Sequence, residues 1–337
     1  MTADSVFWIA SMTKAVTAVA VMQLAEHGLL DLDAPAGEYV PYLADVQVLD
    51  GFAADGTPLL RPPRRPVTTR HLLAHTSGFG YDWTEAKLAK HVPTLPAAPA
   101  GSQAGYEHPL TFDPGEGWSY GIGVDWAGRV VEAASGQRLD EYFREQIFAP
   151  LTMNDTAFAM TGLSPDRLAA MRVRTADGLI EVPFALDLDP EMFMAGGGLY
   201  STVIDYMRFL RMLLAGGSLD GNRVLAPETV AAMTRDQLGE LSASGWTSYN
   251  PGLSNDVELF PGHRVGWALS FMINTHHTPE GRSPGSLAWA GLANTYYWLD
   301  PVEQVAGVFA TQLLPFGDDL ALRAFADFER EVYSANR

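Results

Sequence analysis

The chain of 337 residues carries 40 Asp and Glu against 22 Lys and Arg, a formal net charge of −18. Such an acidic chain repels phosphate, so nucleic acids and anionic membranes are not expected partners, and no apolar run reaches the ~18 residues of a membrane helix. There is no cysteine, which excludes disulfides and thiolate nucleophiles. A globular chain with no recognisable leader peptide is expected in the cytoplasm.

The first predicted helix, residues 11–27, is apolar around most of its circumference and is therefore expected to be central and buried. Ser11 and Lys14 are three residues apart, so their side chains share one face of this helix and can meet. Burial favours the neutral amine of Lys14, which could then take a proton from Ser11. A capping Ser followed by a Lys is also common in ordinary helices, so the pair alone does not establish catalysis.

The middle of the chain predicts mostly helices. Residues 45–66 predict irregular structure or a small hairpin, and a short Thr-capped helix ends near His75, which is expected to support the site rather than act as a base. Residues 92–118 predict a long surface loop beside a cleft. Further helices are expected within 118–151, broken at Gly136, and within 201–217 and 226–237.

After residue 262 the pattern alternates and is rich in β-branched and aromatic residues, which predicts three antiparallel strands within 265–275, 286–298 and 304–313. An amphipathic helix closes the chain. We therefore expect an α+β fold in which helices flank an antiparallel sheet. Residues 1–11 and 241–337 would form the sheet lobe and residues 12–240 a mostly helical lobe, with the active site between them.

Several stretches, in order along the chain, resemble the serine β-lactamase and penicillin-binding-protein superfamily. They include "FWIASMTKAVTAVAVMQLAEHG", "HLLAHTSGFGY", "PGEGWSYGIGVDWAGRVVEAASGQ" and "AWAGLANTYYWLDP". The strongest likeness is to the family VIII carboxylesterases, which are related to class C β-lactamases. The resemblance implies that Ser11 is the nucleophile, Lys14 its base and Tyr120 a proton relay to the leaving alcohol. It also implies an oxyanion hole from the backbone N–H groups of Ser11 and Leu292, with no cofactor and no metal.

Two motifs depart from the β-lactamase pattern. Trp289-Ala290-Gly291 stands where those enzymes carry Lys-Thr-Gly, and Ile122 stands where they carry Asn. By the same resemblance, these four residues would contact the substrate. The missing Lys would have held a substrate carboxylate, whereas an indole offers apolar surface that suits an uncharged ester.

The sequence therefore predicts a serine carboxylesterase that acts on small uncharged esters. The alternatives are a β-lactamase or D-amidase, or an acyltransferase, each using the same acyl-enzyme, and a binding protein without catalysis. A second Ser, Ser283, lies in "GRSPG", which matches the nucleophile elbow of α/β-hydrolases, but that elbow must join a strand to a helix. Ser283 is expected in a hairpin turn instead.

In the family, a longer segment that supplies strands precedes the first helix, whereas only ten residues precede Ser11 here. We therefore expect the N-terminal strands to be missing and the sheet to be reduced. Its free edge would be open beside the pocket or covered by a second copy in a homo-oligomer. A complete five-stranded sheet from one chain would refute this expectation.

Overall fold

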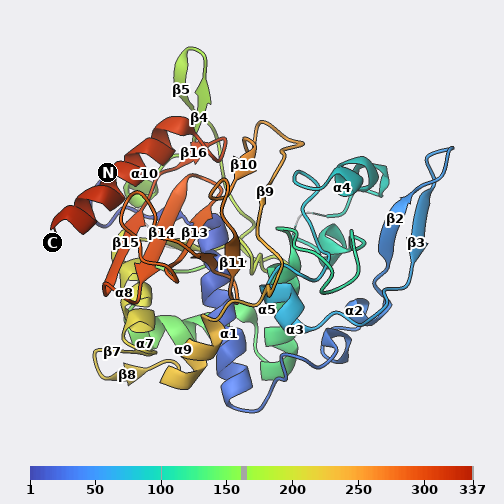
Figure 1. The fold of residues 1–337 in the computed structure, drawn as a ribbon, viewed down its shortest axis with the longest axis horizontal. Coiled ribbons are helices and arrows are strands. Elements are labelled where there is room, and N and C mark those ends of the chain that lie inside the picture. Colours follow the sequence, from blue (N-terminus) through green and yellow to red (C-terminus); the bar gives the residue numbers. More distant parts are fainter. Residues whose placement is uncertain (100, 161–164, 336–337) are drawn as a thin grey trace.

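The computed structural model describes residues 1–99, 101–160 and 165–335. An antiparallel sheet lies on one side and a group of helices on the other, with α1 (Thr13–Glu26) running between them (Figure 1). This arrangement confirms the α+β architecture. Among the described residues, no helix is both long and apolar enough to cross a membrane.

The main sheet has five antiparallel strands in the order β11-β12-β13-β14-β15. Their bounds are Val265–Trp267, Met272–Asn274, Leu287–Gly291, Thr295–Asp300 and Val305–Phe309. Two of the three segments predicted as single strands are hairpins, turned at Ser270 (φ 69°) and Asn294 (φ 56°). One chain therefore builds a five-stranded sheet, and the expected reduction of the sheet is wrong. Whether a second copy covers the outer edge of β15 stays a prediction.

Helices cover both faces of this sheet. On one face, Phe325 of α10 (Asp319–Ala335) stacks on Tyr296 with ring centroids 4.7 Å apart. On the other, Tyr206 of α8 (Val203–Leu214) packs against Tyr297 at 5.3 Å. The division of the chain into lobes at residues 11 and 241 stays a prediction, and α8, which falls in the proposed helical lobe, packs against the sheet.

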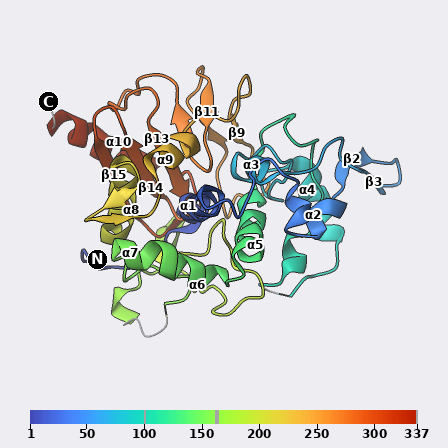
Figure 2. The ribbon, with the colours of Figure 1, turned by 90° about the horizontal axis from the view of Figure 1, so that it is seen from below.

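Helix α1 is the centre of the molecule, because its apolar residues leave no polar face. It is buried from Thr13 to Leu24, with α8 and α9 (Pro227–Met233) on one side and α3 (Thr69–Leu73) and α5 (Gly123–Ser135) on the other (Figure 2). The helix expected from residue 11 begins instead with a 3-10 turn, Ala10–Met12. Ser11 therefore lies in the turn that leads into α1.

Helices α3, α5, α8, α9 and α10 agree with the predicted pattern. Thr68 caps α3, Gly136 ends α5 in a left-handed conformation, and Thr202 caps α8. Other short helices are α2 (Tyr42–Asp45), α4 (Ala86–His91), α6 (Leu139–Phe143), α7 (Ala149–Leu151), a π turn (Arg144–Phe148) and 3-10 turns at Ala36–Glu38, Val92–Thr94, Gln103–Tyr106 and Pro165–Arg167.

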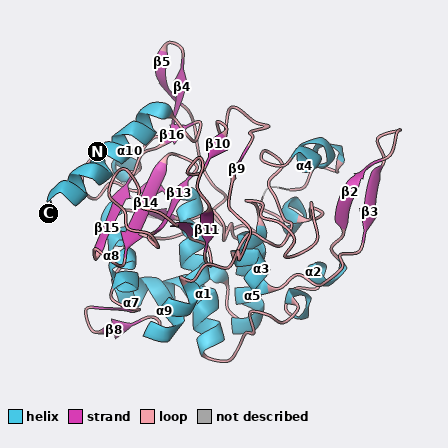
Figure 3. Cartoon of the chain, in the orientation of Figure 1, coloured by secondary structure: helices cyan, strands magenta, loops and turns pink. Residues whose placement is uncertain are grey.

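Small β elements surround this core. The predicted hairpin is β2 (Val48–Phe52) with β3 (Pro58–Arg61), and a second, unexpected hairpin projects elsewhere on the periphery (Figure 3). That second hairpin is β4 (Arg172–Thr175) with β5 (Gly178–Glu181). The other short strands are β16 (Leu313–Leu314), β1 (Phe7–Trp8), β6 (Tyr200–Ser201), β7 (Ser218–Leu219), β8 (Asn222–Arg223), β9 (Gly245–Trp246) and β10 (Val257–Glu258).

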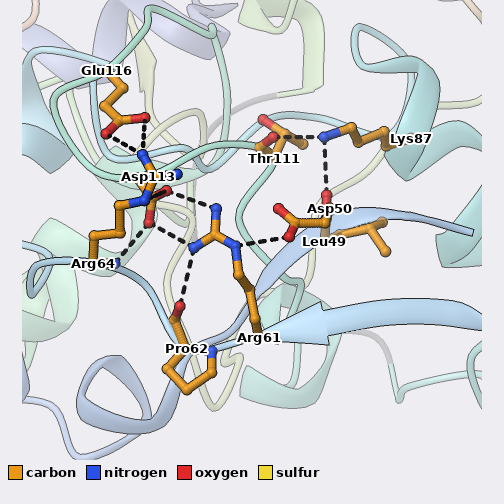
Figure 4. Close-up of polar contacts among 9 residues, drawn as sticks. All are labelled: Leu49, Asp50, Arg61, Pro62, Arg64, Lys87, Thr111, Asp113 and Glu116. Atoms are coloured by element: carbon orange, nitrogen blue, oxygen red, sulfur yellow. Dashed lines mark hydrogen bonds and ion pairs between the residues drawn. The ribbon is translucent and has the colours of Figure 1, made fainter.

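An ion-pair network fastens the β2–β3 hairpin to the loop that leads toward Tyr120 (Figure 4). The carboxylate of Asp113, only 1% exposed, accepts two hydrogen bonds from Arg61, at 2.9 and 2.7 Å, and one from the backbone N–H of Arg64 at 2.7 Å. Nearby, Lys87 Nζ donates to the carbonyls of Leu49 and Thr111 at 3.0 and 2.9 Å. These bonds connect the loop, at Thr111 and Asp113, to the hairpin.

Candidate active site

The turn that carries Ser11 is held from two sides. The backbone N–H of Ile9 donates to the Leu199 carbonyl at 3.0 Å, next to the β1–β6 pair. On the other side, β13 approaches so closely that a Cβ at Gly291 would lie 2.3 Å from the Ile9 carbonyl oxygen. Ala10, between them, has φ 45°, a conformation that costs a non-glycine residue on the order of 1–3 kcal/mol. The surrounding contacts therefore set the position of Ser11 beside the end of β13.

Lys14 points at Ser11 from the first turn of α1 and is fully buried. Its Nζ donates to Ser11 Oγ at 3.1 Å, to Tyr81 Oη at 3.1 Å and to the Gly196 carbonyl at 2.7 Å. An ammonium has three hydrogens, so these three acceptors satisfy it completely. The predicted meeting of the Ser11 and Lys14 side chains is thus present in the structure.

The glycine segment at 196–198 lies directly against the first turns of α1. Thr17 Oγ1 donates to the Ala195 carbonyl at 2.6 Å, and the Leu199 N–H donates to Thr13 Oγ1 at 3.1 Å. Two threonines of α1 therefore hold both ends of the segment, which places the Gly196 carbonyl over Lys14.

Tyr120 lines the same cavity as Ser11. Its hydroxyl accepts a hydrogen bond from Trp289 Nε1 at 3.1 Å, and Lys14 Nζ is 4.8 Å from the centre of its ring. His75 supports this loop: its carbonyl accepts from Ser119 N–H at 2.9 Å and its Nδ1 from Gly121 N–H at 3.4 Å. Burial and the charge of Lys14 hold the pKa of His75 well below its usual value, so His75 is neutral.

The phenol hydrogen-bonded to Lys14 is Tyr81, which the sequence analysis did not select. Burial, helped by the charge of Asp125, raises the pKa of Tyr81 well above its usual value, so the phenol keeps its proton. Tyr81 stacks on Trp83, with ring centroids 5.1 Å apart. Its position in the loop after "HTSGF", one of the stretches that carry the family resemblance, was the only sequence signal for it.

A cavity of about 140 Å³ opens in front of Ser11. It is lined by Trp8, Ala10, Ser11, Tyr81, Trp83, Tyr120, Met194, Gly196, Gly197, Trp246, Trp289, Ala290, Gly291, Leu292 and Phe316. None of these described lining residues carries a charge, and seven are aromatic. The cavity can therefore hold a small apolar group beside the hydroxyl of Ser11.

The predicted site residues line this cavity with two exceptions, Lys14, which is hydrogen-bonded to Ser11, and Ile122. Ser11, Tyr120, Trp289, Ala290, Gly291 and Leu292 all line it. Ile122 does not: it precedes the first turn of α5, is 4% exposed and packs into the hydrophobic core. The backbone turns into α5 directly after Tyr120, which directs Ile122 away from the cavity lining, and its expected contact with the substrate stays a prediction.

The second serine considered in the sequence analysis, Ser283, lies in a hairpin turn as expected. Ser283 lies in the turn between β12 and β13, where its N–H donates to Asp300 Oδ2 at 2.8 Å, and no helix follows it. Within the described residues, no three His, Asp or Glu side chains form a cluster that could hold a metal ion.

Comparison with known proteins assigns the chain to a family. A family model described as Beta-lactamase matches residues 1–331. The chain belongs to the β-lactamase family. The lovastatin esterase of Penicillium rubens is 31% identical over 98% of this chain and 85% of its own length. The monacolin J acid methylbutanoyltransferase of Aspergillus terreus is 31% identical over 97% of this chain and 81% of its own length.

The structure agrees with this assignment to the β-lactamase family. A mutant form of simvastatin synthase from Aspergillus terreus superposes with a TM-score of 0.86 at 30% identity, covering 100% of this chain and 82% of the other. The predicted superfamily and fold are therefore confirmed. The finer assignment to the family VIII carboxylesterases stays a prediction.

Proposed function

We propose that this β-lactamase-family chain is a serine carboxylesterase that hydrolyses small uncharged esters through an acyl-enzyme on Ser11. The observation that carries the proposal is the 3.1 Å bond between Ser11 Oγ and Lys14 Nζ beside an uncharged aromatic cavity. A nucleophile hydrogen-bonded to a base, and a base oriented by further groups, is the arrangement that covalent catalysis requires.

In the proposed reaction, the ester carbonyl oxygen lies against the backbone N–H groups of Ser11 and Leu292. Once the Lys14 ammonium has released one proton, Ser11 Oγ forms a bond to the carbonyl carbon while the serine proton passes to the Lys14 amine, and the carbonyl π pair moves onto oxygen. When the pair returns, the bond to the alcohol oxygen breaks and the alcohol leaves with a proton relayed by Tyr120. Water then attacks the acyl-enzyme by the same steps, which releases the acid and restores Ser11.

The lining of the cavity supports an uncharged substrate with a small acyl group. A β-lactam or peptide carboxylate would need a cation, whereas Trp289 occupies the corresponding position on β13. A cavity of about 140 Å³ is close to the ~150 Å³ that accommodates a benzene molecule. An acyl group of roughly four to six carbons is the largest that fits such a space.

The direct test is Ser11→Ala, assayed with p-nitrophenyl esters and by labelling with an organophosphonate. We expect both turnover and labelling to be lost while the melting temperature stays near that of the wild type. Ser283→Ala is the matched control and should leave both unchanged. If Ser11→Ala keeps more than a few per cent of the activity, or if the wild type is neither labelled nor active, the proposal fails, and the second result would favour a binding protein.

A second candidate is transfer of the acyl group to an alcohol instead of water. The apolar lining supports it, because an aromatic wall holds an alcohol better than a water molecule, and one relative carries a transferase name. The two activities separate when an alcohol is added to the esterase assay. A new ester that forms at the expense of free acid identifies a transferase, and an unchanged yield of acid identifies a hydrolase. The β-lactamase and D-amidase alternatives would require a cation that the described lining does not hold.

A further inference from the structure

The contacts of Lys14 leave its charge without a directly bonded partner. The three acceptors of its ammonium, which are a hydroxyl, a phenol and a backbone carbonyl, are all neutral, although the side chain is fully buried. A buried ion without an opposite charge is strongly destabilised. Some other group must therefore compensate the ammonium that forms when Lys14 takes the serine proton.

Asp125 lies directly behind this arrangement. It comes from the first turn of α5, is 2% exposed, and its Oδ1 accepts a hydrogen bond from the Gly196 N–H at 2.9 Å. The carbonyl of the same glycine accepts the 2.7 Å bond from Lys14. A Cβ at Gly196 would lie 2.6 Å from Asp125 Oδ2, so the residue fits between carboxylate and ammonium only as glycine.

We propose that Asp125 is a positioning residue for Lys14, whose carboxylate fixes the Gly196 carbonyl above Nζ and whose charge stabilises the ammonium formed during acylation. The inference rests on the proposed function. The step itself is the transfer of the Ser11 proton to Lys14 as Oγ bonds to the ester carbon, and Asp125 neither gains nor loses a proton in it. The sequence analysis passed over Asp125 because only the fold brings α5 beside the 196–198 segment.

The proposal predicts a pH dependence, because only ionised Asp125 compensates Lys14. Burial raises the pKa of Asp125 to about 6, against the opposing effects of Lys14 and of the Gly196 N–H. The other titratable groups near this carboxylate are the phenols of Tyr81 and Tyr106, whose pKa values are also raised and which stay neutral in this range. Activity should therefore fall as the pH drops through about 6.

Asp125→Asn is the test, because the amide oxygen can still accept the Gly196 N–H while the charge is removed. Asp205→Asn is the matched control. Asp205 is also buried in the first turn of a helix and accepts a backbone N–H, from Asp155 at 2.8 Å, but it belongs to α8. The readouts are the melting temperature, kcat and KM with p-nitrophenyl butanoate, and the rate of organophosphonate labelling of Ser11 from pH 4.5 to 8.

We expect Asp125→Asn to lower kcat and the labelling rate at least tenfold at pH 8, with little change in KM, and to remove the fall near pH 6. Asp205→Asn should retain the wild-type profile. The proposal is overturned if Asp125→Asn keeps the wild-type rate and profile, or if both variants lose activity equally. If Asp125→Asn does not fold, the wild-type labelling rate decides: a rate that stays constant from pH 8 to pH 5 overturns the proposal. Loss of labelling in Ser11→Ala tests the nucleophile separately, so failure of this inference is distinct from failure of the proposed function.

Discussion

The length of the acyl group that the enzyme accepts should change by one carbon when Gly197 becomes Ala. Gly197 lines the cavity, and its carbonyl accepts a 2.7 Å hydrogen bond from Trp8 Nε1, which an alanine would keep. A Cβ at this position would meet only Met194 Cε at 3.7 Å and the carbonyl carbon of Ala10 at 3.9 Å, which are ordinary contacts with two other lining residues. The variant should therefore fold normally and lose only cavity volume.

The size of the effect follows from the volume. If about 140 Å³ holds roughly six carbons, each carbon takes on the order of 25 Å³, and one added methyl group removes the room for one carbon. Discrimination by one methylene in an apolar pocket is about 10-fold or more. We expect Gly197→Ala to lower kcat/KM about 10-fold on the longest good acyl group of the wild type, and by less than about 3-fold on acetate.

The assay is kcat/KM for p-nitrophenyl esters from acetate to octanoate. The neighbouring Gly196→Ala serves as the control, because its Cβ would clash with Asp125 at 2.6 Å and should lower activity on every ester alike. The reasoning is refuted if Gly197→Ala lowers acetate and butanoate hydrolysis equally, or if it leaves the acyl preference unchanged.

Three other predictions follow from the site and its support. Tyr120→Phe should lower kcat about 10²- to 10⁴-fold on an ethyl ester and much less on a p-nitrophenyl ester, because the p-nitrophenolate leaving group needs no proton. Tyr81→Phe should lower kcat equally on both esters, because the Tyr81 phenol acts through Lys14. If the two variants behave the other way round, Tyr81 is the proton relay and Tyr120 supports Lys14. Nitrocefin should be turned over far more slowly than the best ester, and Trp289→Lys alone should not raise that rate; comparable kcat/KM values would contradict the assignment. Arg61 lowers the pKa of Asp113 to about 2 from 3.8, so the carboxylate stabilises the fold above about pH 4 and this contribution is lost as the pH falls toward 2. The difference in melting temperature between the wild type and Asp113→Asn should therefore shrink from pH 4 to pH 2. Asp50 is half-exposed, so Asp50→Asn should lower the melting temperature less at every pH.

The local pattern was enough to predict the pair at the centre of the site. Ser11 and Lys14 are close in sequence, and any helical turn brings positions i and i+3 together. The burial of α1 also followed from its composition. The two hidden hairpins did not, because each turns at a single residue at positive φ, Ser270 or Asn294, inside an otherwise apolar run that lacks a turn dipeptide such as Asn-Gly. The sequence patterns there are continuous and look like single strands.

The residues that the sequence analysis missed are those placed by long-range packing. Tyr81 reaches Lys14 from a loop 67 positions away, and Trp246 and Phe316 come from segments with no strong periodicity. Ile122 is the opposite case, because a position inferred from a family motif packs into the hydrophobic core at the start of α5. A motif indicates which residues are near the site, but the backbone direction after Tyr120 decides which side chains face the substrate.

The replacement of a cation by Trp289 changes more than the charge of the site. Its indole packs 5.0 Å from the Tyr120 ring and 4.5 Å from that of Trp267, and its N–H donates to the Tyr120 hydroxyl. A lysine at 289 would remove this hydrogen bond and leave part of the apolar wall unfilled, at a cost of the order of a few kcal/mol for a truncated aromatic side chain. The new ammonium would also face a lining whose described residues carry no opposite charge. For this reason a single substitution should damage ester hydrolysis before it creates a carboxylate site, and a change of substrate class would require Trp289 and its aromatic neighbours to change together.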